Sequence, residues 1–229
     1  MDSAAYFQVA HRKIGARDPI WAEVNAYLHR SLDGGVGGTV VDLGAGYCSF
    51  INAATNARRR IAVDVNPECA HYAGEGVEFH AGSADDLDFL EDDSADVVFA
   101  SNLLEHLSPE TGRRLVRGAR RALRPGGTLI LVQPNFYHAY REYFHDVTHQ
   151  TAYTHIGLGD LLEGEGFELA RMEPRFLPLS MQRKYGGFDV GAVPDGLMRV
   201  AVQMYLAMPF RVAGKQMLVV GRKPRRVGP

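Results

Sequence analysis

The chain has 229 residues, of which 46% are hydrophobic, and a formal net charge of −2 at pH 7. This length and composition are typical of one globular domain, and the near-neutral charge argues against a nucleic-acid partner. Two cysteines exclude a disulfide framework, no apolar run approaches the ~20 residues of a membrane span, and the N-terminus lacks the order of a signal peptide. We therefore expect a single domain over residues 1–229 that is cytoplasmic and has no transmembrane segment.

The N-terminal residues 1–35 are predicted to form a helical cap of one or two amphipathic helices. Trp21, Val24, Tyr27 and Leu28 recur there at helical spacing. The glycine-rich stretch 34–38 then interrupts the chain before the first strand, because glycine runs disfavour regular structure.

Residues 38–175 are predicted to form the core, because apolar runs of strand length alternate with helical patterns. Strands are expected near 39–43, 60–64, 77–80, 95–100, 127–132, 167–174 and 216–222. Helices are expected near 48–57, 67–74, 110–123 and 156–164, and the arginines at 58–60 are interpreted as a solvated helix surface. This alternation predicts an α/β fold whose parallel sheet is covered by helices on both faces.

The most informative segment is the first predicted strand with the turn that follows it, Val40-Val41-Asp42-Leu43-Gly44-Ala45-Gly46. Two glycines after a strand end allow a tight turn and let a ligand approach the backbone. Asp64 ends the next strand, where Rossmann-like folds bind the ribose hydroxyls of an adenosine group. A dinucleotide site would need a third glycine, but Cys48 and Ser49 stand at its two alternative positions.

These motifs resemble the class I S-adenosylmethionine-dependent methyltransferases, whose first motif is an acidic strand end followed by Gly-x-Gly. The turn Arg124-Pro125-Gly126-Gly127 and the segment from Asp96 to Leu107 are similar to further motifs of that family. The resemblance covers residues 38–170. It implies an enzyme with a Rossmann-like, doubly wound, mostly parallel seven-stranded sheet whose last strand is antiparallel. It also implies S-adenosyl-L-methionine as cofactor and S-adenosyl-L-homocysteine as product.

The resemblance assigns the cofactor contacts to the ends of the first four strands. Asp64 would accept from the ribose hydroxyls. Either Asp85 or the Ser83 hydroxyl would take the place of the adenine-binding acid that the family often has at the position of Ser83. The alternatives are that Asp64 only caps the following helix, that Asp85 belongs to a solvated acidic loop, and that His106 only packs. The predicted cofactor-binding residues are Asp42, Gly44, Ala45, Gly46, Asp64, Val65, Ser83, Ala84, Asp85, Ser101, Asn102 and His106.

The segment after the fifth strand, residues 133–149, is dense in tyrosine, histidine and phenylalanine. It starts at the carboxyl edge of the sheet, where open α/β folds bind their ligands. A hydroxyl acceptor needs a base, so we predict that His149 or His145 removes its proton and that Asp146 orients one imidazole. The predicted substrate-binding residues are Asn135, Tyr137, Tyr140, Arg141 and Tyr143. The alternative is that several of these side chains only line the domain.

His145-Asp146-x-x-His149 also has two histidines at a spacing that zinc sites use. The sequence shows no third ligand beside them. We therefore predict a catalytic base at this position rather than a metal site, and a metal ion that holds a substrate diol is the alternative.

A looser resemblance concerns the pattern Tyr143-Phe144-x-Asp146-x-Thr148-His149. It is similar to a bacterial subgroup that methylates sugars, glycans and secondary metabolites. This favours methyl transfer to a hydroxyl of a small-molecule or sugar acceptor. The alternatives are N- or C-methylation of a secondary metabolite, a nicotinamide-dependent oxidoreductase, and a non-catalytic cofactor-binding protein.

Residues 177–214 do not fit a plain βα unit and are predicted to be an insertion before the last strand, 215–222. A helix is expected over 196–208, where apolar residues recur at helical spacing. This helix either packs on its own domain or supplies a homodimer face or a lipid-facing surface. We expect the insertion and the N-terminal cap to roof the acceptor pocket, with Trp21 and Tyr27 excluding water.

Overall fold

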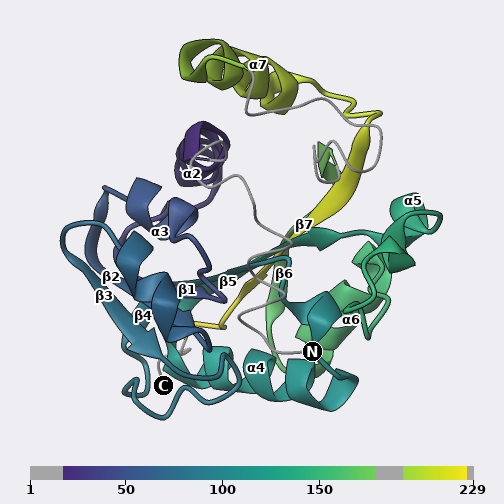
Figure 1. The fold of residues 1–229 in the computed structure, drawn as a ribbon. Coiled ribbons are helices and arrows are strands. Elements are labelled where there is room, and N and C mark those ends of the chain that lie inside the picture. Colours follow the sequence, from purple (N-terminus) through teal and green to yellow (C-terminus); the bar gives the residue numbers. More distant parts are fainter. Residues whose placement is uncertain (1–17, 179–192, 226–229) are drawn as a thin grey trace.

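A seven-stranded sheet forms the centre of the molecule, in a computed structural model that describes residues 18–178 and 193–225 (Figure 1). The strand order is β3-β2-β1-β4-β5-β7-β6. All neighbours from β3 to β5 pair in parallel, whereas β7 is antiparallel to both β5 and β6. The strands are β1 (Gly38–Leu43), β2 (Ala57–Asp64), β3 (Val77–Ala81), β4 (Ala95–Ser101), β5 (Leu123–Pro134), β6 (Glu168–Pro178) and β7 (Gly214–Arg222). The mostly parallel sheet with an antiparallel last strand is therefore confirmed.

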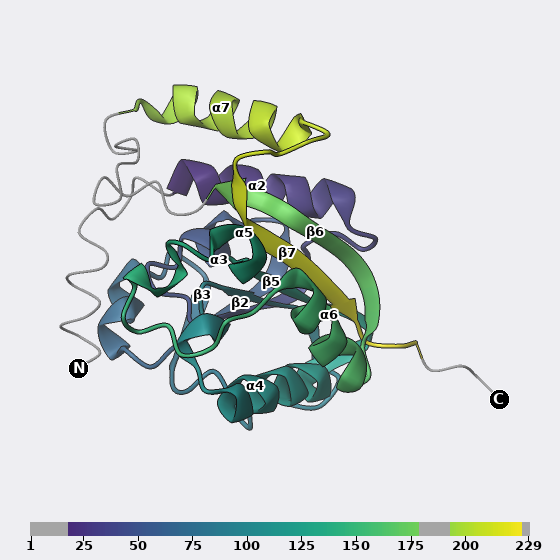
Figure 2. The same cartoon turned by 90° about the vertical axis from the view of Figure 1, so that its right-hand side faces the viewer.

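Helices cover both faces of this sheet, with α2 and α3 on one side and α4 and α6 on the other (Figures 1 and 2). The α-helices are α2 (Asp18–Ser31), α3 (Ser49–Ala53), α4 (Pro109–Ala122), α5 (Phe136–Ala139), α6 (His155–Gly164) and α7 (Asp195–Ala207). The 3-10 helices are η1 (Pro67–Tyr72), η2 (Leu104–His106) and η3 (Tyr143–His145). Local caps define two helix starts, since Ser108 accepts from the Thr111 amide at α4 and Thr154 accepts from the Gly157 amide at α6.

Two hydrophobic cores follow from the alternation of side chains along the buried strands. Val41 and Leu43 of β1 belong to the core under α4 and α6, while Val40 belongs to the core under α2 and α3. Because both faces are covered, the central strands are almost entirely apolar. Asp42 is the one charged residue of β1, and it is buried near the carboxyl end of the strand.

The structure corrects three local predictions. Residues 58–60 lie in β2 rather than on a helix. Arg59 forms an ion pair with Glu78 of the edge strand β3, so the charge of Arg59 is solvated beside that edge. Helix α3 is shorter than predicted because β2 begins at Ala57, where it pairs with Gly38. Strand β5 begins at Leu123, before the Pro-Gly-Gly turn, rather than after it. The pairing of β5 with β4 continues across this turn with a shift in register.

The insertion leaves and re-enters the sheet at its carboxyl edge, since Pro178 pairs with Gly214. Its helix α7 packs on α2, on the side away from the sheet (Figures 1 and 2). The return from α7 is anchored by Arg211, which forms an ion pair with Glu173 and donates to the Tyr27 hydroxyl. Helix α7 therefore packs on its own domain, which is the first of the alternatives given for it above.

Trp21 and Tyr27 do not form the predicted roof. The Trp21 ring packs edge-on against Phe50 and Phe99, with centroids 6.2 and 5.8 Å away, and the Tyr27 hydroxyl donates to Glu173 at 2.9 Å. Both side chains thus build the layer between α2 and the sheet, because α2 lies across the sheet face. The remainder of that prediction concerns residues 1–17 and 179–192, which lie outside the described residues.

None of the helices in the described part of the chain has the length and apolar character needed to cross a membrane.

Candidate active site

The turn after β1 has the left-handed backbone that its glycines predict. Gly44 and Gly46 have φ values of 67° and 52°, and the Gly44 amide donates to the Val63 carbonyl at 2.8 Å. A Cβ on Gly44 would lie 2.9 Å from Leu103 Cδ1, so this turn packs directly on the loop after β4. Cys48 is also left-handed, with φ 55°, which explains why a third glycine would be favoured at its position.

Asp64 joins the glycine turn to the end of β2. Its Oδ2 accepts from the Gly46 amide and its Oδ1 from the Asn66 amide, both at 2.9 Å. These two bonds fix the carboxylate plane, while each oxygen keeps lone-pair capacity for a further donor. The side chain is half-buried and the neighbouring Val65 is exposed. The arrangement fits a ligand that presents two hydroxyl groups to Asp64.

Asp42 lies beneath the turn and is buried. Burial raises the pKa of Asp42 well above its ordinary value, the nearby charge of Asp64 raises it further, and a hydrogen bond with the Ile51 backbone opposes both effects. Burial likewise raises the pKa of the Cys48 and Cys69 thiols to about 12, so both cysteines stay protonated at neutral pH. Both thiols beneath the turn are therefore uncharged, and Asp42 is the group there that a cationic ligand would hold in its ionised form.

The loop after β3 holds the predicted adenine contacts. Asp85 accepts from the Ser83 hydroxyl and from Arg114 of α4, whose Nη2 is 2.7 Å from Oδ2. The Ser83 hydrogen bond and the Arg114 ion pair both lower the pKa of Asp85, so it is ionised. Asp85 is therefore turned toward α4, whereas Ser83 is exposed and Ala84 is buried.

The end of β4 is fixed from the neighbouring strands. The Asn102 amide donates to the Val132 carbonyl, and its side chain links the Ser101 hydroxyl to Gln216 at the start of β7. Asn102 has φ 48°, so the chain turns sharply into η2. Ser101 and Asn102 thus lie at the carboxyl edge, next to the glycine turn that Leu103 contacts.

A cluster of three titratable side chains follows this turn: Glu105, His106 and His149. Each offers a ligand-type atom, and these atoms lie within 4.8 Å of one another. Glu105 is completely buried, and neither carboxylate oxygen has a hydrogen-bond partner among the described residues. The His149 Nδ1 atom is also buried and has no hydrogen-bond partner within residues 18–178 and 193–225, and the His149 ring lies edge-on against His106 at 4.8 Å between centroids. We call these residues the 105–149 cluster.

Backbone bonds hold the two halves of the 105–149 cluster together. The Gln150 and Thr151 amides both donate to the Glu105 carbonyl, at 2.7 and 3.2 Å. The Thr148 hydroxyl donates to Asp146 Oδ1 at 2.6 Å and lies 2.8 Å from His106 Nδ1. Because the hydroxyl proton goes to Asp146, Thr148 accepts from His106, which places the proton of that ring on Nδ1. Asp146 therefore orients His106 through Thr148.

Burial sets the charge of the 105–149 cluster. It raises the pKa of Glu105 to about 8, with a further rise from the charge of Asp146. Burial lowers the pKa of His106 to about 4, and the neighbouring His149 lowers it as well. Burial also lowers the pKa of His149, although the charge of Asp146 raises it. Both imidazoles are therefore neutral at pH 7 and can accept a proton or bind a cation.

With this geometry established, the chain can be compared with known proteins. Residues 41–131 match a family described as a methyltransferase domain. A curated protein of Claviceps purpurea (strain 20.1) named methyltransferase is 30% identical over 182 residues, which are 76% of this chain and 54% of that protein. The chain thus spans about half the length of this relative.

Solved structures agree on the fold. One similar chain comes from the complex between the Haloferax volcanii Trm112 methyltransferase activator and a putative methyltransferase. It is 21% identical with a TM-score of 0.67, covering 96% of this chain and 97% of that chain. A SAM-dependent methyltransferase of Archaeoglobus fulgidus is 21% identical with a TM-score of 0.67, covering 97% and 100%.

Residues 41–131 therefore match a methyltransferase domain, and the fold is the one that solved S-adenosylmethionine-dependent methyltransferases have. This match favours S-adenosylmethionine as the cofactor over the nicotinamide of an oxidoreductase, which a Rossmann-like fold alone would also allow. The polar groups at the carboxyl edge fit that cofactor. Asp64 presents lone pairs for a ribose diol, and buried Asp42 would be ionised by a ligand that carries sulfonium and ammonium groups, because their charge opposes the effect of burial.

Sequence reasoning assigned roles to His106 and His149 separately and missed Glu105. The structure places His106 in the 105–149 cluster, against His149 and Thr148. The signal for Glu105 was present as a carboxylate inside the apolar run Leu103-Leu104-Glu105-His106-Leu107, where burial would leave it unsolvated. Its proximity to His149 could not be seen, because the two residues are 44 positions apart.

Two predicted substrate contacts have structural roles in the methyltransferase domain. Asn135 is completely buried, and its amide group bonds to His155 and to the Pro174 carbonyl while accepting from the Tyr137 amide. Tyr143 is buried and donates to the Thr151 carbonyl at 2.7 Å. The polar atoms of both side chains therefore make hydrogen bonds within the protein.

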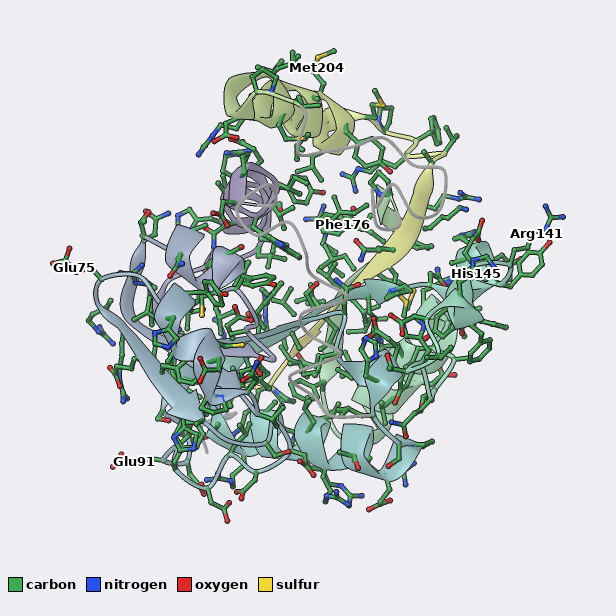
Figure 3. The ribbon with its side chains drawn as sticks, in the orientation of Figure 1. Glu75, Glu91, Arg141, His145, Phe176 and Met204 are labelled. Carbon is green, nitrogen blue, oxygen red and sulfur yellow. The ribbon has the colours of Figure 1, made fainter. Side chains whose placement is uncertain are left out.

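Three other predicted substrate contacts are exposed. Tyr137 and Tyr140 have most of their side chains in solvent, and the Arg141 guanidinium lies 5.5 Å from the Tyr140 ring centroid. His145 is also exposed, and Figure 3 shows Arg141 and His145 together at the right-hand edge of the molecule. These residues are accessible to an acceptor, whereas His149 is partly buried behind them.

A cavity of about 700 Å³ lies elsewhere, at the amino edge of the sheet, and is lined by charged residues such as Asp93, Arg121 and Lys223. We do not assign the cofactor to it, because Gly44 and Asp64 lie at the opposite edge. Two of the charged residues that line this cavity, Lys223 and Asp93, already form an ion pair with each other.

Replacing Asp42 with asparagine is expected to make the folded methyltransferase domain more stable at pH 7 but not at pH 4. The folded-state pKa of Asp42 is raised above its unfolded value, so the unfolded chain ionises first as pH rises. Wild-type stability is therefore lost progressively above the unfolded pKa of about 3.9, and asparagine removes this loss. Urea unfolding of both proteins at the two pH values measures the difference. A variant that is less stable than wild type at both values would contradict the assignment.

Proposed function

We propose that the domain methylates a hydroxyl oxygen of a small-molecule or sugar-like acceptor bound between the glycine turn and the 105–149 cluster. The observation that carries this proposal is the pair of neutral, half-buried imidazoles of His106 and His149 at η2, directly after Leu103, whose side chain packs against the glycine turn. An alcohol needs a base as it attacks, whereas a neutral amine does not. A site equipped to receive a proton therefore favours an oxygen acceptor.

Asp42, Asp64 and the glycine turn would hold S-adenosylmethionine, which would supply an activated methyl group for transfer to the acceptor oxygen and would leave as S-adenosylhomocysteine. The residues of this chain do the rest by positioning, excluding water and removing a proton. The acceptor proton goes to an imidazole of the 145–149 segment, His149 or His145. Asp146 orients the site through Thr148. Tyr137, Tyr140 and Arg141 are the candidates for acceptor contacts, because they are exposed beside it.

The sugar, glycan or secondary-metabolite character of the acceptor rests on the exposed tyrosines and arginine, which can stack on a ring and donate to hydroxyl groups. A cytoplasmic location and a homodimer are also proposals, and they are based on the sequence.

The test uses S-adenosylmethionine with a ¹³C-labelled methyl group and a panel of sugars, phenols and amines. We expect the label to appear as a methyl ether, identified by the carbon shift of the product in NMR spectra. Label transferred to nitrogen or carbon, by a protein that binds S-adenosylhomocysteine normally, would overturn O-methylation in favour of N- or C-methylation. Cofactor binding without any transfer across the panel would favour a non-catalytic cofactor-binding protein.

A further inference from the structure

The 105–149 cluster has a feature that acid–base catalysis does not use. Glu105 contributes two buried carboxylate oxygens, and neither has a hydrogen-bond partner among the described residues. A buried acceptor without a donor is costly, and a general base does not require one beside it. His149 Nδ1 is buried at the same place, and it too has no hydrogen-bond partner in the part of the chain that the structure describes. Three unsatisfied or neutral ligand-type groups therefore converge on one point.

We propose that Glu105, His106 and His149 bind one divalent transition-metal ion. Their ligand atoms lie within 4.8 Å of one another, so a point exists about 2.8 Å or less from all three. Bonds of about 2.0–2.2 Å to zinc then require each side chain to move by less than ~1 Å. Two imidazoles and one carboxylate are the donor set of many catalytic sites for zinc and iron, and they leave coordination positions open.

The groups behind the cluster have the arrangement of a metal site. A ligating histidine donates its second ring N–H to an oxygen, which fixes the ring and its tautomer. His106 does this through Nδ1 and Thr148, and Thr148 is in turn held by Asp146. The Gln150 and Thr151 amides donate to the Glu105 carbonyl, and these hydrogen bonds attach the segment that carries His149 to η2. The three side chains are thus positioned before an ion arrives.

The role of the ion rests on the proposed function, although its binding does not. A cation at this point would attract the acceptor oxygen and lower the pKa of its hydroxyl group. The O–H bond then breaks as the O–CH₃ bond forms, and the proton passes to His145, which is exposed and not part of the ligand set. The oxidation state of the ion does not change.

The test is calorimetric titration of the chelator-treated full chain with ZnCl₂ and, separately, MnCl₂. We expect one ion per chain for at least one of the two metals. Glu105→Gln keeps the side-chain shape without the charge and is expected to weaken binding at least 100-fold. Thr148→Val removes the group behind His106 and is expected to weaken it about 10- to 100-fold. His71→Ala removes an exposed histidine of η1 and serves as the matched control with unchanged binding.

Folding of every variant is checked by S-adenosylhomocysteine titration, because Asp64 and the glycine turn do not belong to the cluster. Absence of stoichiometric binding to the wild type, or full affinity in Glu105→Gln, would overturn the metal site. As a second readout, Mn²⁺ should broaden the ring NMR signals of His106 and His149 but not that of His71. A methyl ether product without metal binding would refute only this inference, whereas metal binding with N-methylation would refute only the oxygen acceptor.

Discussion

Replacing His149 with alanine is expected to lower turnover about 10²- to 10⁴-fold, the usual contribution of general acid–base catalysis. The ring lies beside His106 at the end of β4, where the acceptor and the activated methyl group should meet. Affinity for S-adenosylhomocysteine should barely change, because Asp64 and the glycine turn lie on neighbouring strands and do not contact this ring. Turnover is measured with saturating cofactor, and affinity by calorimetry.

His145→Ala separates the two roles that the histidines can have. If both variants lose turnover and only His149→Ala loses metal binding, His149 is a ligand and His145 receives the proton. If only His149→Ala loses turnover and neither variant affects metal binding, His149 is the base. Near-normal turnover of both variants at neutral pH would exclude acid–base catalysis by this segment, and an amine or carbon acceptor would then explain the chemistry better.

Replacing Asp64 with alanine is expected to weaken cofactor binding about 10- to 100-fold while the fold is kept. Its carboxylate accepts from the Gly46 and Asn66 amides and has capacity left for ribose hydroxyls. A charge-assisted hydrogen bond lost from such a site corresponds to roughly 1.5–3 kcal/mol of binding free energy. The large effect follows because the variant loses the ligand contact and also loosens the glycine turn.

Calorimetric titration with S-adenosylhomocysteine measures this effect, and Asp64→Asn separates its two parts. Asparagine can still accept from the Gly46 amide through one oxygen, so the turn is kept while the charge is lost. Glu78→Ala, which removes the exposed partner of Arg59 on the adjacent strand, is the matched control and should bind normally. A folded Asp64→Ala variant with wild-type affinity would refute the ribose assignment.

The sequence by itself determined the sheet, the order of its elements and the cofactor turn. Each of these depends on short-range patterns: apolar runs of strand length, the glycines after Leu43, and the acid that ends the second strand. Residues at the carboxyl ends of parallel strands meet at one edge of the sheet, so Gly44 and Asp64 could be placed together without knowledge of the packing.

Only the tertiary structure decided which polar side chains near the acceptor face inward and what they meet. Asn135 and Tyr143 were predicted to contact substrate, but burial commits their polar atoms to the protein itself. Glu105 and His149 are distant in sequence and become neighbours because the segment after β5 folds back onto η2 through backbone hydrogen bonds. Burial and long-range pairing depend on contacts between separate segments of the chain, and local sequence patterns do not predict such contacts.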